Sequence, residues 1–296
     1  MTLLIALLLG VVQGVFMFVP VSSTSHLVLT QTWLRDRGVD LPPPDSAEMV
    51  LFDLIVHVGS LVSIAIVMRV GLVELATGVR DDLRTGRLRD GGLREAVSTR
   101  LIALMLVSTA VTGVLGLTFR GQLTAVFGSP TMVAVALVVT GAMLWWTDAM
   151  LPGRGPRWAA FGTRGPAEVT LWIAVAVGVA QALALAPGVS RSGTTIFVAL
   201  LVGLRRQLAA RYSFYVAIPT ILAASGVQLI GVLGDGGLNE VSWAAMGVGF
   251  VVSAVVGAVF LWLVLRLLEQ ARFRIFSVYV WALAVVVVVS GVGVSA

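Results

Sequence analysis

Six stretches of this sequence are apolar over the ~20 residues that a helix needs to cross the hydrocarbon core of a membrane. They cover residues 49–69, 100–118, 129–149, 212–232, 242–265 and 275–294. Only 12% of the 296 residues are charged and the mean hydropathy is +1.00, whereas a soluble domain of this length carries far more charge. The sequence therefore predicts an all-α polytopic membrane protein with six transmembrane helices.

Two further apolar stretches differ from these six because a proline and a polar turn interrupt each of them. Counted with the adjoining part of its polar turn, the second arm of each has about 13 residues, or ~20 Å as a helix, which is too short to cross the membrane. Each stretch therefore predicts a re-entrant hairpin that enters the membrane, breaks at its proline and leaves on the same side. The first hairpin has arms at 2–19 and 27–34 around Pro20, and the second has arms at 169–186 and 196–204 around Pro187.

The distribution of arginine supports this topology. If neither hairpin makes a net crossing, 16 arginines fall in the loops on one side of the membrane and three on the other. If only the second hairpin crossed, the split would be 10 against 9. Arginine-rich loops stay in the cytoplasm, so we expect both termini outside and the 69–100 loop inside. The pI of 10.9 then reflects membrane topology, and we expect no nucleic-acid partner.

The chain reads as two related halves joined by a linker. Residues 1–149 contain the hairpin of 1–34 and three spans, and residues 168–296 contain the hairpin of 168–204 and three spans, with a cytoplasmic linker at 150–167. The segment GVVQGVFMFVPVSS from Gly10 echoes GVAQALALAPGVSRS from Gly178. Because the hairpins enter from opposite sides, the sequence predicts an inverted-topology repeat, which typically builds a polar site near the membrane midplane.

The two polar turns each place the beginning of a half-helix at membrane depth. Free backbone N–H groups and the positive end of the helix dipole favour an anion there. Hydroxyl side chains line both turns: Ser22, Ser23 and Thr24 in the first, and Ser190, Ser192, Thr194 and Thr195 in the second. Several of these serines could equally be ordinary helix N-caps.

Arg191 is the only charged residue between Val169 and Leu204. An arginine at the centre of a membrane helix costs about 2.5–3.5 kcal/mol on insertion scales, so it usually has an anionic partner. No carboxylate lies in residues 1–34 or 169–204, and a guanidinium fork suits phosphate. We therefore expect Arg191 to bind a phosphate group of the ligand, with hydrogen bonds to backbone carbonyls as the structural alternative.

The remaining polar candidates have structural alternatives too. Gln13 and Gln181 occupy equivalent positions in the two hairpins and could simply tie them together, while His26 could be a packing residue. In FDLIVHVGS, Asp53 and His57 lie four residues apart and share a helical face. Asp53 is a possible acid of the site, and its alternative is an interfacial position.

Four motifs resemble those of the bacitracin-resistance undecaprenyl-diphosphatases, integral membrane lipid phosphatases of bacteria. They are VPVSSTSHL from Val19, FDLIVHVGS from Phe52, APGVSRSGTT from Ala186 and ARYSFYVAIP from Ala210, and the likeness runs on through RFRIFSVYVWAL. The resemblance implies removal of one phosphate from undecaprenyl diphosphate on the outer side of the bacterial plasma membrane. The product, the monophosphate carrier, serves cell-wall synthesis.

The resemblance also implies roles for individual residues. Ser23 is the candidate nucleophile and His26 its acid–base partner, although either could take the phosphoryl group, and Arg191 clamps the diphosphate. The expected substrate-binding residues are Gln13, Ser22, Thr24, Gln181, Ser190, Ser192, Gly193 and Thr195.

One position departs from the family pattern. The family carries Glu or Gln followed four residues later by Glu, and this chain has Gln13 and Met17 there. The resemblance implies Mg²⁺ or Ca²⁺ as a cofactor, yet a thioether is a poor ligand for either ion and cannot act as a base. Two alternatives therefore stay open beside the phosphatase: a transporter or flippase of polyprenyl phosphates, and a catalytically silent lipid-binding relative. The oligomeric state is not predicted.

Overall fold

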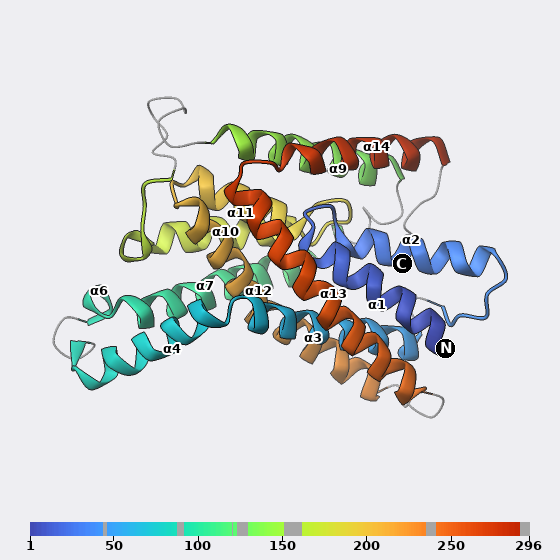
Figure 1. Cartoon of the computed structure of the whole chain (residues 1–296), viewed down its shortest axis with the longest axis horizontal. Helices are drawn as coiled ribbons and strands as arrows, with labels where there is room; N and C mark the ends of the chain where they lie inside the picture. The colour runs from blue at the N-terminus through green and yellow to red at the C-terminus, as the bar shows by residue number, and fades with distance from the viewer. Residues whose placement is uncertain are drawn as a thin grey trace.

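The structure is a computed structural model that describes residues 1–43, 46–87, 92–119, 121–122, 130–150, 162–234 and 241–290, with only the backbone at Thr24, Pro130 and Ser290. Within these ranges the chain is helical apart from its connections, and a single β-bridge joins Arg164 to Leu204 (Figure 1). The helices are α1 Leu3–Phe18, α2 Ser23–Asp36, α3 Ala47–Val67, α4 Arg69–Arg84, α6 Gly92–Glu95, α7 Val97–Thr118, α9 Pro130–Ala149, η1 Pro166–Glu168, α10 Leu171–Leu183, α11 Arg191–Leu201, α12 Arg206–Gly234, α13 Trp243–Glu269 and α14 Arg274–Ser290.

Five helices of the described chain are long and apolar enough to span a membrane, namely α3, α7, α9, α12 and α13. These confirm five of the six expected spans. The sixth corresponds to α14, which has 17 described residues and falls just short of that length, while the end of the expected stretch lies outside the described residues. Helix α12 begins six residues before the expected span. Hydropathy marks only the apolar part of a helix, and the more polar segment 206–211 forms the first helical turns without a helix-breaking residue in it.

Each expected hairpin is a pair of helices separated at its proline. Helix α1 ends at Phe18, and Val19 takes the extended conformation that a following proline favours. Helix α2 then begins at Ser23 and packs back on α1. Helices α10 and α11 repeat this arrangement around Pro187, with α11 only 11 residues long. The predicted helix–proline–helix units are therefore confirmed.

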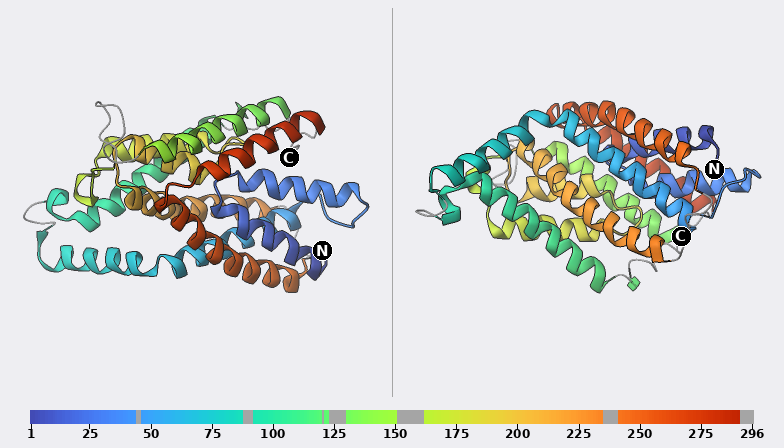
Figure 2. Two further views of the ribbon diagram at one scale, coloured as in Figure 1. Left: turned by 45° about the horizontal axis from the view of Figure 1, so that its top comes forward. Right: turned by 90° about the horizontal axis from the view of Figure 1, so that it is seen from below.

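The hairpins are held by close packing on long helices. Helix α1 packs on α13 and α3, α10 packs on α7, and α9 lies alongside α14 (Figures 1 and 2). Small residues permit the approach: a Cβ on Gly14 would lie 2.9 Å from the backbone nitrogen of Gly257, and one on Gly178 would lie 2.7 Å from the carbonyl oxygen of Ser108. These contacts fix where each hairpin lies against the long helices.

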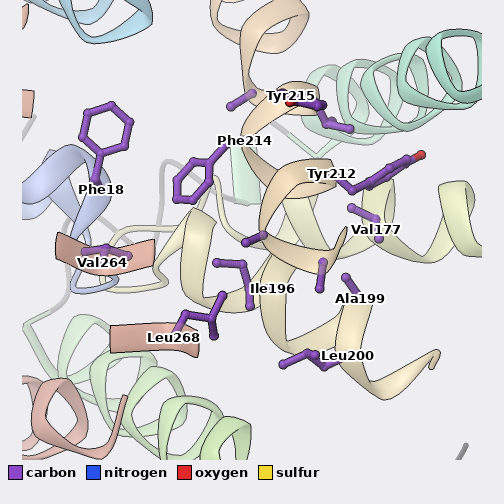
Figure 3. Close-up of a cluster of buried hydrophobic side chains, with 14 of the residues drawn as sticks. Phe18, Val177, Ile196, Ala199, Leu200, Tyr212, Phe214, Tyr215, Val264 and Leu268 are labelled. Atoms are coloured by element: carbon purple, nitrogen blue, oxygen red, sulfur yellow. The ribbon is translucent and has the colours of Figure 1, made fainter. Parts of the chain in front are cut away.

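A buried cluster fixes the second hairpin in place. Ile196, Ala199 and Leu200 of α11 face Tyr212 and Phe214 of α12 (Figure 3). Across the cluster, the ring of Phe18 at the end of α1 lies 5.9 Å from that of Phe214. The beginning of α11 is thereby brought beside the end of α1.

Three elements of the described chain were not predicted, namely the short α6 and η1 and the longer α4. Residues 69–84, expected as part of a cytoplasmic loop, form helix α4, which follows α3 after Met68 and packs on α7. Asp82 of α4 accepts hydrogen bonds from the backbone nitrogen of Thr99 at 3.0 Å and from its hydroxyl at 3.2 Å. This tertiary contact stabilises a helix whose polar sequence gives no hydropathy signal.

Candidate functional site

The turns of the two hairpins meet in the structure. The backbone N–H of Gly188 donates to Ser25 Oγ at 3.2 Å, and Ser192 Oγ donates to the carbonyl of Phe18 at 3.5 Å. Gly188 has a φ of +84°, and a Cβ there would lie 2.6 Å from the carbonyl oxygen of Val133. Glycine is therefore required for this turn to reach its partner.

Arg191 opens α11 at this junction and is half-buried. Its Nη2 lies 3.8 Å from the sulfur of Met17, and Gln13 Nε2 approaches the same sulfur at 3.6 Å. Within the described chain no carboxylate lies within 4 Å of this guanidinium, and no carbonyl accepts from it. The structural alternative of a backbone-bonded arginine finds no support here. The thioether is a weak acceptor, so the guanidinium keeps most of its donor capacity for a ligand.

His26, in the first turn of α2, has both ring nitrogens engaged. Nδ1 lies 2.8 Å from the carbonyl oxygen of Ser22, and Nε2 lies 2.8 Å from the hydroxyl of Tyr279 on α14. Ser22 itself has a φ of +71°, a left-handed conformation that is rare for a serine. This backbone bend turns the Ser22 carbonyl toward the imidazole.

Ser23, the candidate nucleophile, is half-buried and makes no hydrogen bond among the described residues. The hydrogen bond to His26 that an activated serine requires is not formed, because that ring is already bound to Ser22 and Tyr279. Ser22 Oγ pairs with Ser25 Oγ at 3.1 Å. The side chain of Thr24 lies outside the described residues.

The hydroxyls of the second turn mainly build the turn. Ser190 caps α11 by accepting a hydrogen bond from the backbone nitrogen of Gly193 at 3.2 Å. This confirms for Ser190 the alternative that some of these serines are helix N-caps. Thr195 Oγ1 lies 2.7 Å from the carbonyl oxygen of Arg191 and 2.5 Å from Ser213 Oγ. Together with Ser192, these side chains attach the beginning of α11 to its surroundings.

The two glutamines do not bind each other, so the hypothesis that they tie the hairpins together is wrong. Gln181 donates to Thr112 at 3.1 Å and to Thr220 at 2.8 Å, away from Arg191. Gln13 is fully buried beside Met17, and its carbonyl oxygen has no hydrogen-bond partner. Gln13 and Arg191 therefore approach the same thioether, Gln13 from within its own helix and Arg191 from the second hairpin.

Asp53 and His57 lie on α3 next to this junction. Asp53 accepts from Gln31 Nε2 of α2 at 3.2 Å, and His57 Nδ1 lies 2.7 Å from the carbonyl oxygen of Asp53. His57 is close enough to Arg191 for an electrostatic interaction. Asp53 is thus bound to the first hairpin, with no direct contact to the guanidinium.

The residues around Arg191 do not fit a hard divalent cation. Mg²⁺ and Ca²⁺ take oxygen ligands, but the nearest side chains are the thioether of Met17 and the amide of Gln13, beside a positive charge. No group of three His, Cys, Asp or Glu side chains gathers anywhere in the described chain.

An apolar groove of about 530 Å³ leads away from His26 between α2 and α14. Leu29, Trp33, Leu283, Val286 and Val287 supply its apolar lining, and two threonines and Asp36 complete it. A groove of this shape and polarity suits a hydrocarbon chain whose polar end lies near His26.

Sequence reasoning did not identify Ser25 or Tyr279. Ser25 joins the two turns, and Tyr279 binds the histidine. Neither carried a signal, because a serine in a polar turn and a tyrosine in an apolar helix are both ordinary, and the bonds they make connect distant parts of the chain.

The sequence is similar to those of known proteins over nearly its whole length. The bacitracin resistance protein BacA family matches residues 6–286. The chain is 50% identical over 286 residues to an undecaprenyl-diphosphatase of Alkalilimnicola ehrlichii, covering 96% of this chain and 95% of the relative. Undecaprenyl-diphosphatases of Halorhodospira halophila and Moorella thermoacetica are 48% and 34% identical, and each comparison covers 96% or more of both chains.

Proposed function

The chain belongs to the bacitracin resistance protein BacA family, and on that premise we propose that it is an undecaprenyl-diphosphatase. It is a membrane lipid phosphatase that removes the terminal phosphate of undecaprenyl diphosphate and leaves the monophosphate carrier. The observation that carries this function at the site is Arg191, a guanidinium without a carboxylate partner in the described chain, at the junction of two hairpin turns. A diphosphate supplies the missing negative charge.

The diphosphate binds with its oxygens on Arg191 and on the beginning of α11. Phosphoryl transfer needs little more than alignment and stabilisation of charge on the equatorial oxygens, and a fixed guanidinium supplies both. Ser190, Ser192 and Thr195 act indirectly, because their hydrogen bonds hold the arginine's helix in place.

Ser23 is the hydroxyl left free for the substrate. Every other candidate hydroxyl whose side chain is described already has a partner, whereas Ser23 has none. It lies one helical turn before His26, so this histidine remains the acid–base group nearest in sequence. The phosphoryl group goes to Ser23 or, in the second arrangement that the family implies, to His26.

The packing also supports an inverted repeat with six spans, α14 included. Helix α1 packs on α13 just as its counterpart α10 packs on α7, and the two last helices of the halves, α9 and α14, pack on each other. The arginine distribution supports an orientation in which both termini and the site lie on the outer side of the bacterial plasma membrane.

The groove between α2 and α14 receives the beginning of the polyprenyl chain. Its apolar lining starts at His26, where the head group ends. At the other end of the head group, Met17 replaces a carboxylate, so the protein turns over without a cation bound at that position.

Purified protein in detergent tests the function. It should release phosphate from undecaprenyl diphosphate, and Ser23→Ala and Arg191→Ala should each lower the rate at least ~100-fold, the scale of losing a main charge-stabilising or reacting group. Ser277→Ala is the matched control, because that buried hydroxyl has no hydrogen-bond partner either. Normal turnover by the Arg191 variant would overturn the assignment, and lipid movement between leaflets without phosphate release would favour a transporter.

A further inference from the structure

The hydrogen bonds of His26 define its protonation. The carbonyl of Ser22, 2.8 Å from Nδ1, can only accept a hydrogen bond, so Nδ1 carries a proton. In the neutral ring Nε2 is then a lone-pair acceptor, and the hydroxyl of Tyr279 at 2.8 Å donates to it. The structure thus selects one of the two neutral tautomers.

The ring plane is fixed as well. Phe16 of α1 stacks on the imidazole with centroids 3.8 Å apart and an interplanar angle of 19°. Tyr279 approaches from α14, 253 residues away in sequence, and its ring lies within 20° of the same plane. Phe16 of α1, the carbonyl of Ser22 before α2 and Tyr279 of α14 therefore determine where the lone pair of His26 Nε2 points.

We propose that Tyr279 is a positioning residue for His26, an inference that rests on the proposed phosphatase function. Its hydroxyl holds the imidazole as the Nδ1-protonated neutral tautomer and keeps Nε2 free of a proton until substrate is bound. Nε2 has one lone pair, so it cannot accept from Tyr279 and from an attacking hydroxyl together. During turnover the attacking hydroxyl replaces Tyr279 at this nitrogen, and between turnovers Tyr279 restores the ring.

Tyr279→Phe removes the hydroxyl and keeps the ring. The buried Nε2 then loses its donor and the imidazole loses one of its three restraints. We expect kcat to fall about tenfold with KM within about twofold, because the hydroxyl orients the histidine and does not contact the head group. Tyr215→Phe is the matched control: its hydroxyl is buried without a hydrogen-bond partner, and kcat should stay within about twofold of wild type.

A second measurement needs no turnover. The chain has two histidines, so ¹⁵N-histidine labelling of the His57→Gln protein reports His26 alone. Without substrate, Nδ1 should carry the proton and Nε2 should show the resonance of an unprotonated, hydrogen-bonded nitrogen. Adding Tyr279→Phe should shift the Nε2 resonance while Nδ1 stays protonated, and adding Tyr215→Phe should shift neither.

The two measurements separate this inference from the function. A protonated Nε2 in the neutral ring, or a Tyr279→Phe protein that matches Tyr215→Phe in both kcat and Nε2 resonance, overturns the role of Tyr279 whatever the activity. A wild type that releases no phosphate overturns the proposed function, and the nitrogen resonances then still decide whether Tyr279 positions the ring.

Discussion

Replacing Arg191 by methionine should make the protein more stable and catalytically dead. The guanidinium has only a weak contact to Met17 Sδ and no carboxylate within 4 Å in the described chain. An arginine without compensation at membrane depth costs ~2.5–3.5 kcal/mol on insertion scales, and this one is only half-buried. We therefore expect Arg191→Met to raise the free energy of unfolding by about 1–3 kcal/mol.

The activity should change in the opposite direction. The variant loses the charge that binds the diphosphate and stabilises its transition state, so phosphate release should fall at least ~100-fold. If the variant is more stable but inactive, Arg191 lowers the free energy of unfolding in the wild type and is retained for its function.

Arg206→Met is the matched control, since Arg206 is also partly buried but has hydrogen-bond partners. It donates to the carbonyl oxygens of Leu268 at 3.1 Å, Thr147 at 2.9 Å and Met150 at 3.3 Å, and it lies 4.0 Å from Asp148. Its removal leaves these acceptors unsatisfied and should lower stability by roughly 1–3 kcal/mol.

Thermal and denaturant unfolding in one detergent, followed by tryptophan fluorescence and circular dichroism, measures both variants. The eight tryptophans provide the signal. If Arg191→Met were destabilised as Arg206→Met is, the guanidinium would have structural partners and the argument for an absent anionic ligand would fail.

Three further changes have defined outcomes. Met17→Glu places a carboxylate near Arg191, with an attraction of ~4 kcal/mol at 4 Å and an effective dielectric of 20, before desolvation. Chelators should slow phosphate release by this variant and leave release by the wild type within about twofold. A wild type that chelators inactivate contradicts this expectation. Gly14→Ala should lower the unfolding free energy by about 1–3 kcal/mol, because its Cβ would meet the backbone of α13, whereas Gly113→Ala in open space should have little effect. Leu283→Trp should fill the groove and raise KM about fivefold for undecaprenyl and farnesyl diphosphate alike, because both lipids carry the beginning of the chain there, and an unchanged KM would place the chain elsewhere.

Much of the fold was accessible from the sequence because its signals are local. Long apolar runs predicted α3, α7, α9, α12 and α13, and Pro20 and Pro187 predicted the breaks in the hairpins. Helix α4 was missed because its polar sequence resembles a loop, and its helix depends on contacts of Asp82 with α7.

The sequence predicted which residues form the candidate site, but it did not predict the hydrogen bonds that they make. Arg191 and the serine turns were recognised from charge and composition, and the structure brings them together. The expected pair of Ser23 and His26 was not found, because His26 is held by Tyr279, and Gln181 turned away from the site toward Thr112 and Thr220.

The amino-acid sequence alone determined that this chain enters a membrane, bends at two prolines and carries a single arginine in the uncharged stretch around the second one. Those properties follow from transfer free energies and backbone stereochemistry, which act over a few residues. Only the tertiary structure decided which hydroxyl stays free and which nitrogen of His26 holds a proton. Hydrogen bonds form over about 3 Å, so their partners are known only once packing has brought distant helices together.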